Sequence, residues 1–125
     1  MIHGIGIDIV AINRIQHILE QNPRFVDKIF SVQEIDYCSK RANPAQSYAA
    51  RFAAKEAFLK AIGTGWDQGI SWCEIEVWNL DKGKPELKIS GRTKEIADSQ
   101  GVASIHLSLS HEKENAIAMV VLERT

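Results

Sequence analysis

The sequence has few cysteines, no long apolar run and no excess of one charge, and each absence excludes a class of protein. Its two cysteines, Cys38 and Cys73, form no CxxC pair or other metal-ligand spacing, so we expect idle thiols in a cytoplasmic protein. No apolar run approaches the length of about 18 residues typical of a membrane span, and the N-terminal segment lacks the features of a signal peptide. Fifteen basic and sixteen acidic residues give a net charge of −1. We therefore expect neither a membrane nor a nucleic acid as partner.

What the sequence does contain is enough apolar residues for one ordinary core. It has 125 residues, 45% hydrophobic and 25% charged, which predicts a single domain over residues 1–125. Helical patterns group early and strand patterns late, which is typical of an α+β fold with a mostly antiparallel sheet and helices packed on it. A turn at Asp81-Lys82-Gly83 should join two of the strands. We expect helices at residues 13–21, 23–30, 31–41, 45–62 and 92–99, and strands at 2–11, 71–78, 85–89, 104–110 and 116–122.

Asp8 is the first residue with unusual chemistry for its position. It lies in the middle of the first predicted strand, where aspartate is disfavoured. Gly4 and Gly6 share its face and have no side chains, so they leave room for another group to approach the backbone. Asp8 is therefore either a strand residue that faces water or part of a site.

Glu56 is the second such residue. On an ideal helix, with Phe52 taken as zero, Glu56 lies at about 40°, inside an apolar stripe that also holds Leu59. A carboxylate that faces the core must be protonated, paired or bound to a cation, because burial of an unpaired charge is costly. Lys60 follows four residues later, and a surface ion pair would explain the lysine but not the inward direction of Glu56. Asp8 and Glu56 together suggest a site for Mg²⁺, which two carboxylates, water and phosphates commonly hold.

Basic residues and a glycine-rich loop accompany the same helix. Arg51, Lys55 and Lys60 lie along it, and Gly63-Thr64-Gly65 follows its end. Gly63 fits a left-handed helix cap, and the loop also offers backbone N–H groups and a hydroxyl to a phosphate. The loop is not a P-loop, because it lacks the GxxxxGK[ST] pattern and does not lead from a strand into a helix.

Two further groups of residues have both a structural and a functional interpretation. Ser110 and His111 lie at the mouth of the last hairpin, but the chain has no GxSxG motif that would support a serine hydrolase. Arg14, Arg24 and Lys28 are basic residues of the first helical region. They are either scattered surface charge or a patch for an acidic protein partner.

Together these motifs resemble one family over nearly the whole chain. Their order and spacing are similar to those of the holo-[acyl-carrier-protein] synthases, the short, single-domain group of 4′-phosphopantetheinyl transferases. The most specific signal is the FAAKEA segment downstream of a GIDIV strand. The family often has glutamate directly after this strand motif, where this chain has Ala11. The matching segments are GIGIDIVAINR at 4–14, RFAAKEAFLKAIGTG at 51–65, GKP at 83–85 and SLSH at 108–111.

The resemblance implies an enzyme that moves the 4′-phosphopantetheine group of coenzyme A to a serine of apo acyl carrier protein. Adenosine 3′,5′-bisphosphate would be the other product, and the reaction would serve fatty acid biosynthesis and lipid metabolism. By the same resemblance, Asp8 and Glu56 would hold Mg²⁺ and Lys60 would lie near the pyrophosphate. The family forms homotrimers with active sites between subunits, and Arg14 and Arg24 match its docking surface for the carrier protein. The residues implied in coenzyme A binding are Arg51, Lys55, Gly63, Thr64, Gly65, Lys84, Pro85, Ser110 and His111.

The residues suit this chemistry, and the enzyme would need no nucleophile of its own, in agreement with the lack of a recognisable catalytic triad. Attack on a pyrophosphate requires neutralised charge on its oxygens, which a bridging cation and Lys60 would supply. The attacking hydroxyl would belong to the carrier protein, and its base would be Glu56 or a metal-held water next to Asp8. The alternatives are a different Mg²⁺-dependent phosphotransferase or phosphodiesterase, a non-catalytic nucleotide-binding trimer and a structural subunit.

Overall fold

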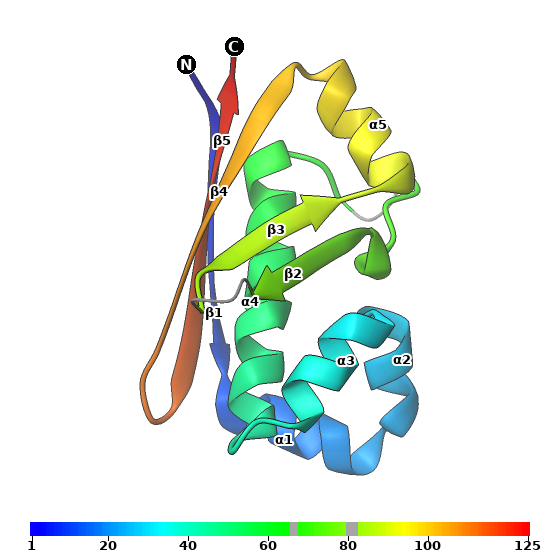
Figure 1. The fold of residues 1–125 in the computed structure, drawn as a ribbon, viewed down its shortest axis with the longest axis vertical. Helices are drawn as coiled ribbons and strands as arrows, with labels where there is room; N and C mark the ends of the chain where they lie inside the picture. Colours follow the sequence, from blue (N-terminus) through cyan, green and yellow to red (C-terminus); the bar gives the residue numbers. More distant parts are fainter. Residues whose placement is uncertain (66–67, 80–82) are drawn as a thin grey trace.

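The α+β architecture with antiparallel sheets is confirmed by the computed structural model, which describes residues 1–65, 68–79 and 83–125 (Figure 1). One sheet has the strand order β1-β5-β4, and β2 pairs with β3 in a second sheet. Within the described ranges, no helix has the length and apolar composition needed to cross a membrane. The elements are β1 (Ile2–Ala11), α1 (Ile12–Gln21), α2 (Pro23–Ile29), α3 (Val32–Ser39), α4 (Pro44–Ile62), the 3₁₀ helix η2 (Trp72–Glu74), β2 (Ile75–Asn79), β3 (Pro85–Ile89), α5 (Gly91–Ser99), β4 (Val102–His111) and β5 (Asn115–Arg124).

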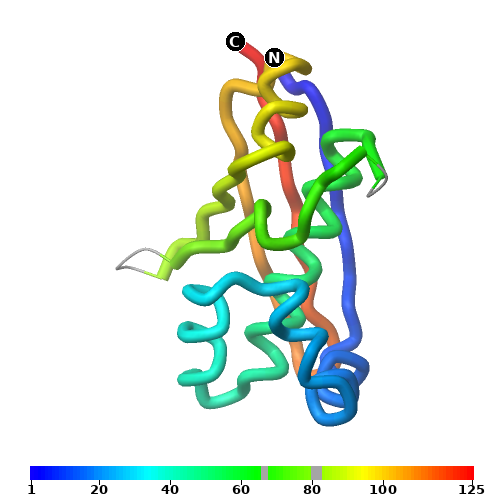
Figure 2. The backbone as a smooth tube through the Cα atoms, turned by 90° about the vertical axis from the view of Figure 1, so that its right-hand side faces the viewer, coloured from blue at the N-terminus to red at the C-terminus, as the bar shows by residue number. Residues whose placement is uncertain are grey.

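Helix α4 is the central element of the fold. Its N-cap Asn43 accepts a hydrogen bond from the backbone N–H of Gln46 at 3.3 Å, and Pro44 occupies the first turn. The helix ends at Gly63, whose φ of 77° is the left-handed cap that the sequence predicts. It runs along one face of the long sheet, with the smaller sheet and the first three helices on its other sides (Figures 1 and 2). Almost its whole length is therefore buried.

Two glycines bring β1 and α4 into direct backbone contact. A Cβ atom at Gly6 would lie 1.8 Å from the carbonyl oxygen of Ala57, and one at Gly4 would lie 2.0 Å from that of Ala61. A side chain at either position would therefore push the helix away from the strand. Because side chains alternate along a strand, Asp8 lies on the same α4-facing side of β1 as the two glycines.

The opposite face of the long sheet is exposed, and its part along β1 is apolar. Ile5, Ile7 and Ile9 of β1 are 56%, 57% and 60% exposed, and Met119 of β5 is 41% exposed. The inward side of β4 follows the predicted alternation, with Leu107 among the residues packed against the core. The sheet therefore has one face covered by the chain itself and one face that the chain leaves open.

The region before β2 differs from its prediction as a strand. Residues 72–74 form η2, because the Glu74 carboxylate accepts hydrogen bonds from the backbone N–H of Ser71 at 3.4 Å and the hydroxyl of Thr93 at 2.9 Å. Cys73 therefore does not belong to the alternating strand pattern. The predicted turn at residues 81–83 lies outside the described residues except for Gly83.

Candidate active site

Asp8 and Lys60 form an ion pair where β1 meets the last turn of α4. The ammonium nitrogen of Lys60 lies 3.0 Å from Oδ1 of Asp8 and 3.0 Å from the carbonyl oxygen of Ile7. The Asp8 side chain is 17% exposed and that of Lys60 is 53% exposed, so the pair is open to solvent. Lys60 therefore pairs with Asp8 instead of Glu56, the residue four positions before it on the helix.

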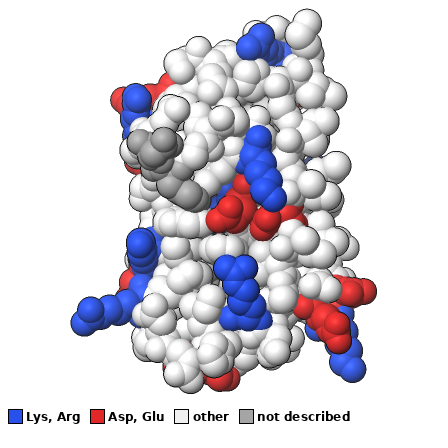
Figure 3. All heavy atoms as spheres, turned by 180° about the vertical axis from the view of Figure 1, so that it is seen from behind, with Lys and Arg blue, Asp and Glu red and all other residues white. Residues whose placement is uncertain are grey.

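Glu56 lies next to this pair and is half-buried. Burial raises the pKa of the Glu56 carboxyl, the nearby Asp8 carboxylate raises it further, and Lys60 and Arg14 lower it. The charge of Asp8 therefore acts on Glu56 across the contact between β1 and α4. Figure 3 shows acidic atoms between basic side chains near the middle of one face of the molecule.

The two carboxylates suit a divalent cation that also binds a ligand. In the part of the chain that the structure describes, no group of three His, Cys, Asp or Glu side chains could hold a metal ion by itself. A cation would relieve the repulsion between Asp8 and Glu56, which otherwise favours protonation of one of them. Mg²⁺ commonly binds one or two protein carboxylates and completes its shell with water and phosphate oxygens. The donor set therefore fits Mg²⁺ held jointly by the protein and a phosphate ligand.

Two predicted ligand-binding residues carry buried polar atoms without a hydrogen-bond partner among the described residues. These atoms are the hydroxyl oxygen of Thr64, just after the Gly63 cap, and Nε of Arg51. The same Arg51 donates from Nη2 to Oδ1 of Asn79, and its guanidinium carbon lies 4.2 Å from the centre of the Tyr37 ring. Buried polar groups are seldom left unpaired, so both atoms are candidates to meet a ligand.

Lys55 lies in the core instead of at a ligand-binding surface. Its ammonium forms an ion pair with Glu34 at 2.8 Å and donates to the carbonyl oxygens of Trp72 at 3.0 Å and Ile75 at 2.5 Å. These three acceptors use all three protons of the ammonium, so none remains for a ligand. This placement corrects the prediction that Lys55 contacts coenzyme A. The pair escaped prediction because Glu34 lies 21 residues earlier, on another helix, where it also forms the capping box of α3 with Ser31.

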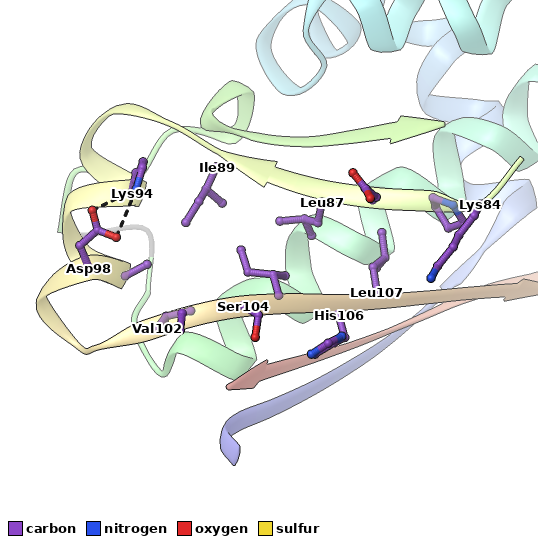
Figure 4. Close-up of a pocket in the computed structure, with 14 residues that line it drawn as sticks. Lys84, Leu87, Ile89, Lys94, Asp98, Val102, Ser104, His106 and Leu107 are labelled. Carbon is purple, nitrogen blue, oxygen red and sulfur yellow. Dashed lines mark hydrogen bonds and ion pairs between the residues drawn. The ribbon is translucent and has the colours of Figure 1, made fainter. Parts of the chain in front are cut away.

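Lys84 and Pro85 lie at the start of β3, at one end of a cavity of about 450 Å³ between β3, α5 and β4 (Figure 4). Leu87 is among the apolar residues that line it. Lys94 and Asp98 of α5, which form an ion pair at 3.1 Å, lie at the other end. The sequence did not predict this cavity, although its lining comes from three consecutive elements, because the strand patterns do not show that β3 and β4 belong to different sheets.

Ser110 and His111 lie in a third place, near the end of β4. They line a hollow of about 300 Å³ together with Ile9 and Ile117. A single chain therefore distributes the predicted residues over the β1–α4 contact, the start of β3 and the end of β4.

The two arginines predicted to dock a partner lie on adjacent helices. Arg14 on α1 and Arg24 on α2 are both exposed. Arg14 also lies near enough to Glu56 to lower the pKa of that carboxyl. Arg14 of α1 is therefore next to the acid pair.

Known proteins similar to this chain in sequence and fold share one name. The family model of the 4′-phosphopantetheinyl transferase superfamily matches residues 4–120. Relatives named holo-[acyl-carrier-protein] synthase from Geobacter sp. (strain M21) and Trichlorobacter lovleyi are 53% and 52% identical, and the matches cover 99% and 98% of this chain and 100% and 98% of theirs. The crystal structure of such a synthase from Bacillus anthracis in complex with CoA (3′,5′-ADP) is 42% identical with a TM-score of 0.82, and the match covers 100% of this chain and 99% of that one. The structure from Neisseria meningitidis is 35% identical with a TM-score of 0.90, covering 99% and 100%.

Proposed function

The chain belongs to the 4′-phosphopantetheinyl transferase superfamily, and we propose that it is a Mg²⁺-dependent holo-[acyl-carrier-protein] synthase. It transfers the 4′-phosphopantetheine group of coenzyme A to a serine of apo acyl carrier protein and releases adenosine 3′,5′-bisphosphate. The dependence on Mg²⁺ rests on the meeting of Asp8 and Glu56 at the β1–α4 contact.

In this reaction the serine oxygen of the carrier protein attacks the phosphorus that carries the pantetheine group. A new oxygen–phosphorus bond forms, the bond to the bridging oxygen breaks, and adenosine 3′,5′-bisphosphate leaves with that oxygen. Mg²⁺ held by Asp8 and Glu56 would withdraw charge from the pyrophosphate oxygens. Lys60, whose ammonium lies 3.0 Å from Asp8, adds a fixed positive charge next to this site.

The serine hydroxyl must lose its proton during the attack. Glu56 is one candidate to accept it, because burial and Asp8 raise the pKa of its carboxyl towards the range in which a general base works well. The other candidate is a water molecule next to Asp8. In both cases the chain provides the base and the carrier protein provides the nucleophile.

We propose that coenzyme A binds where two subunits of a homotrimer meet. The exposed face with Ile5, Ile7 and Ile9 is an apolar patch of the kind that marks protein interfaces. Within one chain, His111 and Lys84 lie in places separate from the acid pair. Assembly would let one subunit provide the acids and its neighbour provide His111 and Lys84.

The other predicted coenzyme contacts are the Gly63–Gly65 loop, Pro85, Ser110 and Arg51. The buried Nε of Arg51 and the buried hydroxyl of Thr64 would gain the hydrogen-bond partners that they lack among residues 1–65, 68–79 and 83–125. Each such hydrogen bond removes the cost of an unpaired buried group, so it favours binding.

We propose that the carrier protein, an acidic partner, docks on the exposed cations Arg14 and Arg24. Because Arg14 is also near Glu56, docking on α1 would bring the carrier serine to the acid pair. We place the reaction in the cytoplasm, in support of fatty acid biosynthesis, where both free cysteines would stay reduced.

An intact-mass assay tests this function. The protein is incubated with coenzyme A, Mg²⁺ and an apo acyl carrier protein, and the carrier should gain the mass of one phosphopantetheine group. Addition of EDTA should stop the gain, and excess Mg²⁺ should restore it. Asp8→Asn and Glu56→Gln should abolish transfer while the circular dichroism spectrum is retained, and Glu95→Gln, at an exposed acid of α5, should remain active.

The outcomes distinguish the alternatives. Release of a nucleotide without a change in carrier mass would indicate a different phosphotransferase or a phosphodiesterase. Binding of coenzyme A without turnover of any carrier would indicate a non-catalytic nucleotide-binding protein. Full activity of Glu56→Gln would contradict both its role in metal binding and its role as the base.

A further inference from the structure

The buried pair between Glu34 and Lys55 joins four elements of the fold at one point. Both side chains are fully buried, and their charged atoms lie 2.8 Å apart. Lys55 of α4 also donates to carbonyl oxygens of η2 and of the first residue of β2. Glu34 accepts backbone N–H groups from Ser31, just before α3, and from Val77 of β2, both at 3.0 Å. The ammonium therefore connects α4 to α3, η2 and β2 through one carboxylate and two backbone carbonyl oxygens.

Stability alone does not account for an ion pair at this place. Removing two charges from water is costly, and apolar residues of similar volume often give an equally or more stable core. The ion pair instead restricts the position of the Lys55 ammonium, because charge-assisted hydrogen bonds to fixed backbone groups tolerate little displacement. Lys55 is the residue next to Glu56 on α4, so a restriction on the position of Lys55 also restricts the position of Glu56 through the helix backbone.

Rotation of α4 decides where the Glu56 carboxylate lies. Neighbouring residues on a helix differ by about 100° around the axis, so Lys55 and Glu56 point to different sides of α4. A rotation of about 10° would move a side chain that lies about 5–6 Å from the axis by about 1 Å. The contact between Gly6 and Ala57 fixes the distance of α4 from β1, but it does not by itself fix the rotation.

We propose that the Glu34–Lys55 pair is a positioning device that sets the rotation of α4 and thereby directs Glu56 toward the cation it shares with Asp8. This inference rests on the proposed function, because it assumes that Asp8 and Glu56 bind Mg²⁺. Lys55 and Glu34 touch neither substrate nor cation and act only through the helix.

The test compares the carboxylates of Glu34 and Glu74. Each connects separate elements of the fold, but only Glu34 bonds to a residue of α4. Glu34→Gln keeps the size of the side chain and removes its charge. The matched control is Glu74→Gln, since Glu74 connects η2 to α5 through Thr93 and Arg92 and has no bond to α4. Mg²⁺ binding is measured by calorimetric titration of the folded protein with coenzyme A present to supply the phosphate ligands. The values of kcat and KM are measured with coenzyme A and carrier protein.

In Glu34→Gln we expect the dissociation constant for Mg²⁺ to rise about tenfold, the lower end of the range for groups that orient metal ligands. The value of kcat should fall with it, and KM for the carrier protein, which docks on α1, should stay unchanged. Glu74→Gln should bind Mg²⁺ with wild-type affinity even where its melting temperature falls by the same amount. A merely structural role of Glu34 would lower the folded fraction without changing the Mg²⁺ affinity of the folded molecules.

A second variant keeps the test decisive if Glu34→Gln does not fold. Glu34→Asp retains the charge but shortens the side chain, so Lys55 must move to keep its partner, and Mg²⁺ affinity should again fall. Wild-type Mg²⁺ affinity and kcat in whichever of the two variants folds would overturn the positioning role. Absence of Mg²⁺ binding by the wild-type protein in the presence of coenzyme A would instead overturn the proposed function, and the positioning role with it.

Discussion

Two acid–lysine pairs hold α4, and they differ in how completely their charges are satisfied. The Glu34–Lys55 pair has a distance of 2.8 Å and no exposed side-chain surface. The Asp8–Lys60 pair has a distance of 3.0 Å, with side chains 17% and 53% exposed. Both pairs combine a lysine of α4 with an acid from another element, so residue type alone does not separate them.

The difference lies in the surroundings of each pair. The ammonium of Lys55 has three acceptors and the carboxylate of Glu34 has backbone donors, so the pair is closed to further partners. The carboxylate of Asp8 lies near that of Glu56, so two negative charges share one nearby lysine. A closed pair shapes the fold, whereas an excess of negative charge leaves a place for a cation.

The largest expected effect is the loss of stability on opening the closed pair. Lys55→Met leaves Glu34 buried without its partner, which should cost about 3–5 kcal/mol of unfolding free energy. Lys60→Met removes the lysine of the open pair and should cost no more than about 1 kcal/mol. Urea unfolding followed by circular dichroism gives both values, and equal losses would show that the two pairs do not differ in this way.

The next effect is on catalysis, where the lysine of the open Asp8–Lys60 pair matters more than that of the closed Glu34–Lys55 pair. Lys60→Met should lower the rate of transfer about 10²-fold, as expected when one fixed charge is removed from a developing negative charge. Lys40→Met is the matched control, because Lys40 forms an exposed pair with Asp36 at 2.8 Å elsewhere on the surface. Steady-state kinetics with coenzyme A and carrier protein would contradict this role of Lys60 if both variants kept the wild-type rate.

The third effect is that of a methyl group placed at the strand–helix contact, which should lower both stability and Mg²⁺ affinity. Gly6→Ala places a Cβ atom 1.8 Å from the carbonyl oxygen of Ala57, so α4 must move away from β1. We expect a loss of about 1–3 kcal/mol of unfolding free energy from this overpacking. We also expect weaker Mg²⁺ binding, because Ala57 is the neighbour of Glu56.

Gly4→Ala is the control for that variant, since its Cβ atom would meet the carbonyl oxygen of Ala61 at 2.0 Å, further along the helix. It should lose similar stability with a smaller loss of Mg²⁺ affinity. The same loss of affinity in both variants would mean that the contact matters only for overall packing.

The smallest effect concerns the charge of Glu56 in the metal-free protein. Its pKa is raised above the ordinary value of 4.5, so its contribution to stability is present at low pH and is lost as the pH rises through the raised pKa. Glu56→Gln avoids this loss, so in EDTA its melting temperature should exceed that of the wild type by more at pH 7 than at pH 4. Mg²⁺ should stabilise the wild type and so reduce the difference in melting temperature between the two proteins at pH 7. A difference in melting temperature that is the same at pH 4 and pH 7 would rule out the repulsion between Asp8 and Glu56.

Local sequence signals predicted the elements that position the acid pair. The alternating pattern of residues 2–11 and the helix that ends at Gly63 are confirmed, because a strand period and a glycine cap depend on neighbouring residues. Asp8 and Glu56 stood out because each acid lies where its local pattern calls for another type of residue. The structure adds that both lie at one strand–helix contact.

Features that depend on distant residues could not be predicted in the same way. The burial of Lys55 requires Glu34 and two backbone carbonyl groups from η2 and β2, none of which is its neighbour on α4. The start of β2 is shortened because Glu74 bonds to Thr93, 19 residues further along. In both cases a buried or half-buried carboxylate accepts hydrogen bonds from separate elements, and local residue preferences cannot predict such contacts.

The glycine contact also determines how rigidly the backbone of β1, which carries Asp8, is held against the backbone of α4, which carries Glu56. Packed elements usually meet through a layer of side chains that can change rotamer and absorb small motions. At Gly6 this layer is missing and one backbone rests directly on the other. Heating should therefore loosen the exposed turns well before it alters the distance between the backbones of β1 and α4, the two elements that carry Asp8 and Glu56.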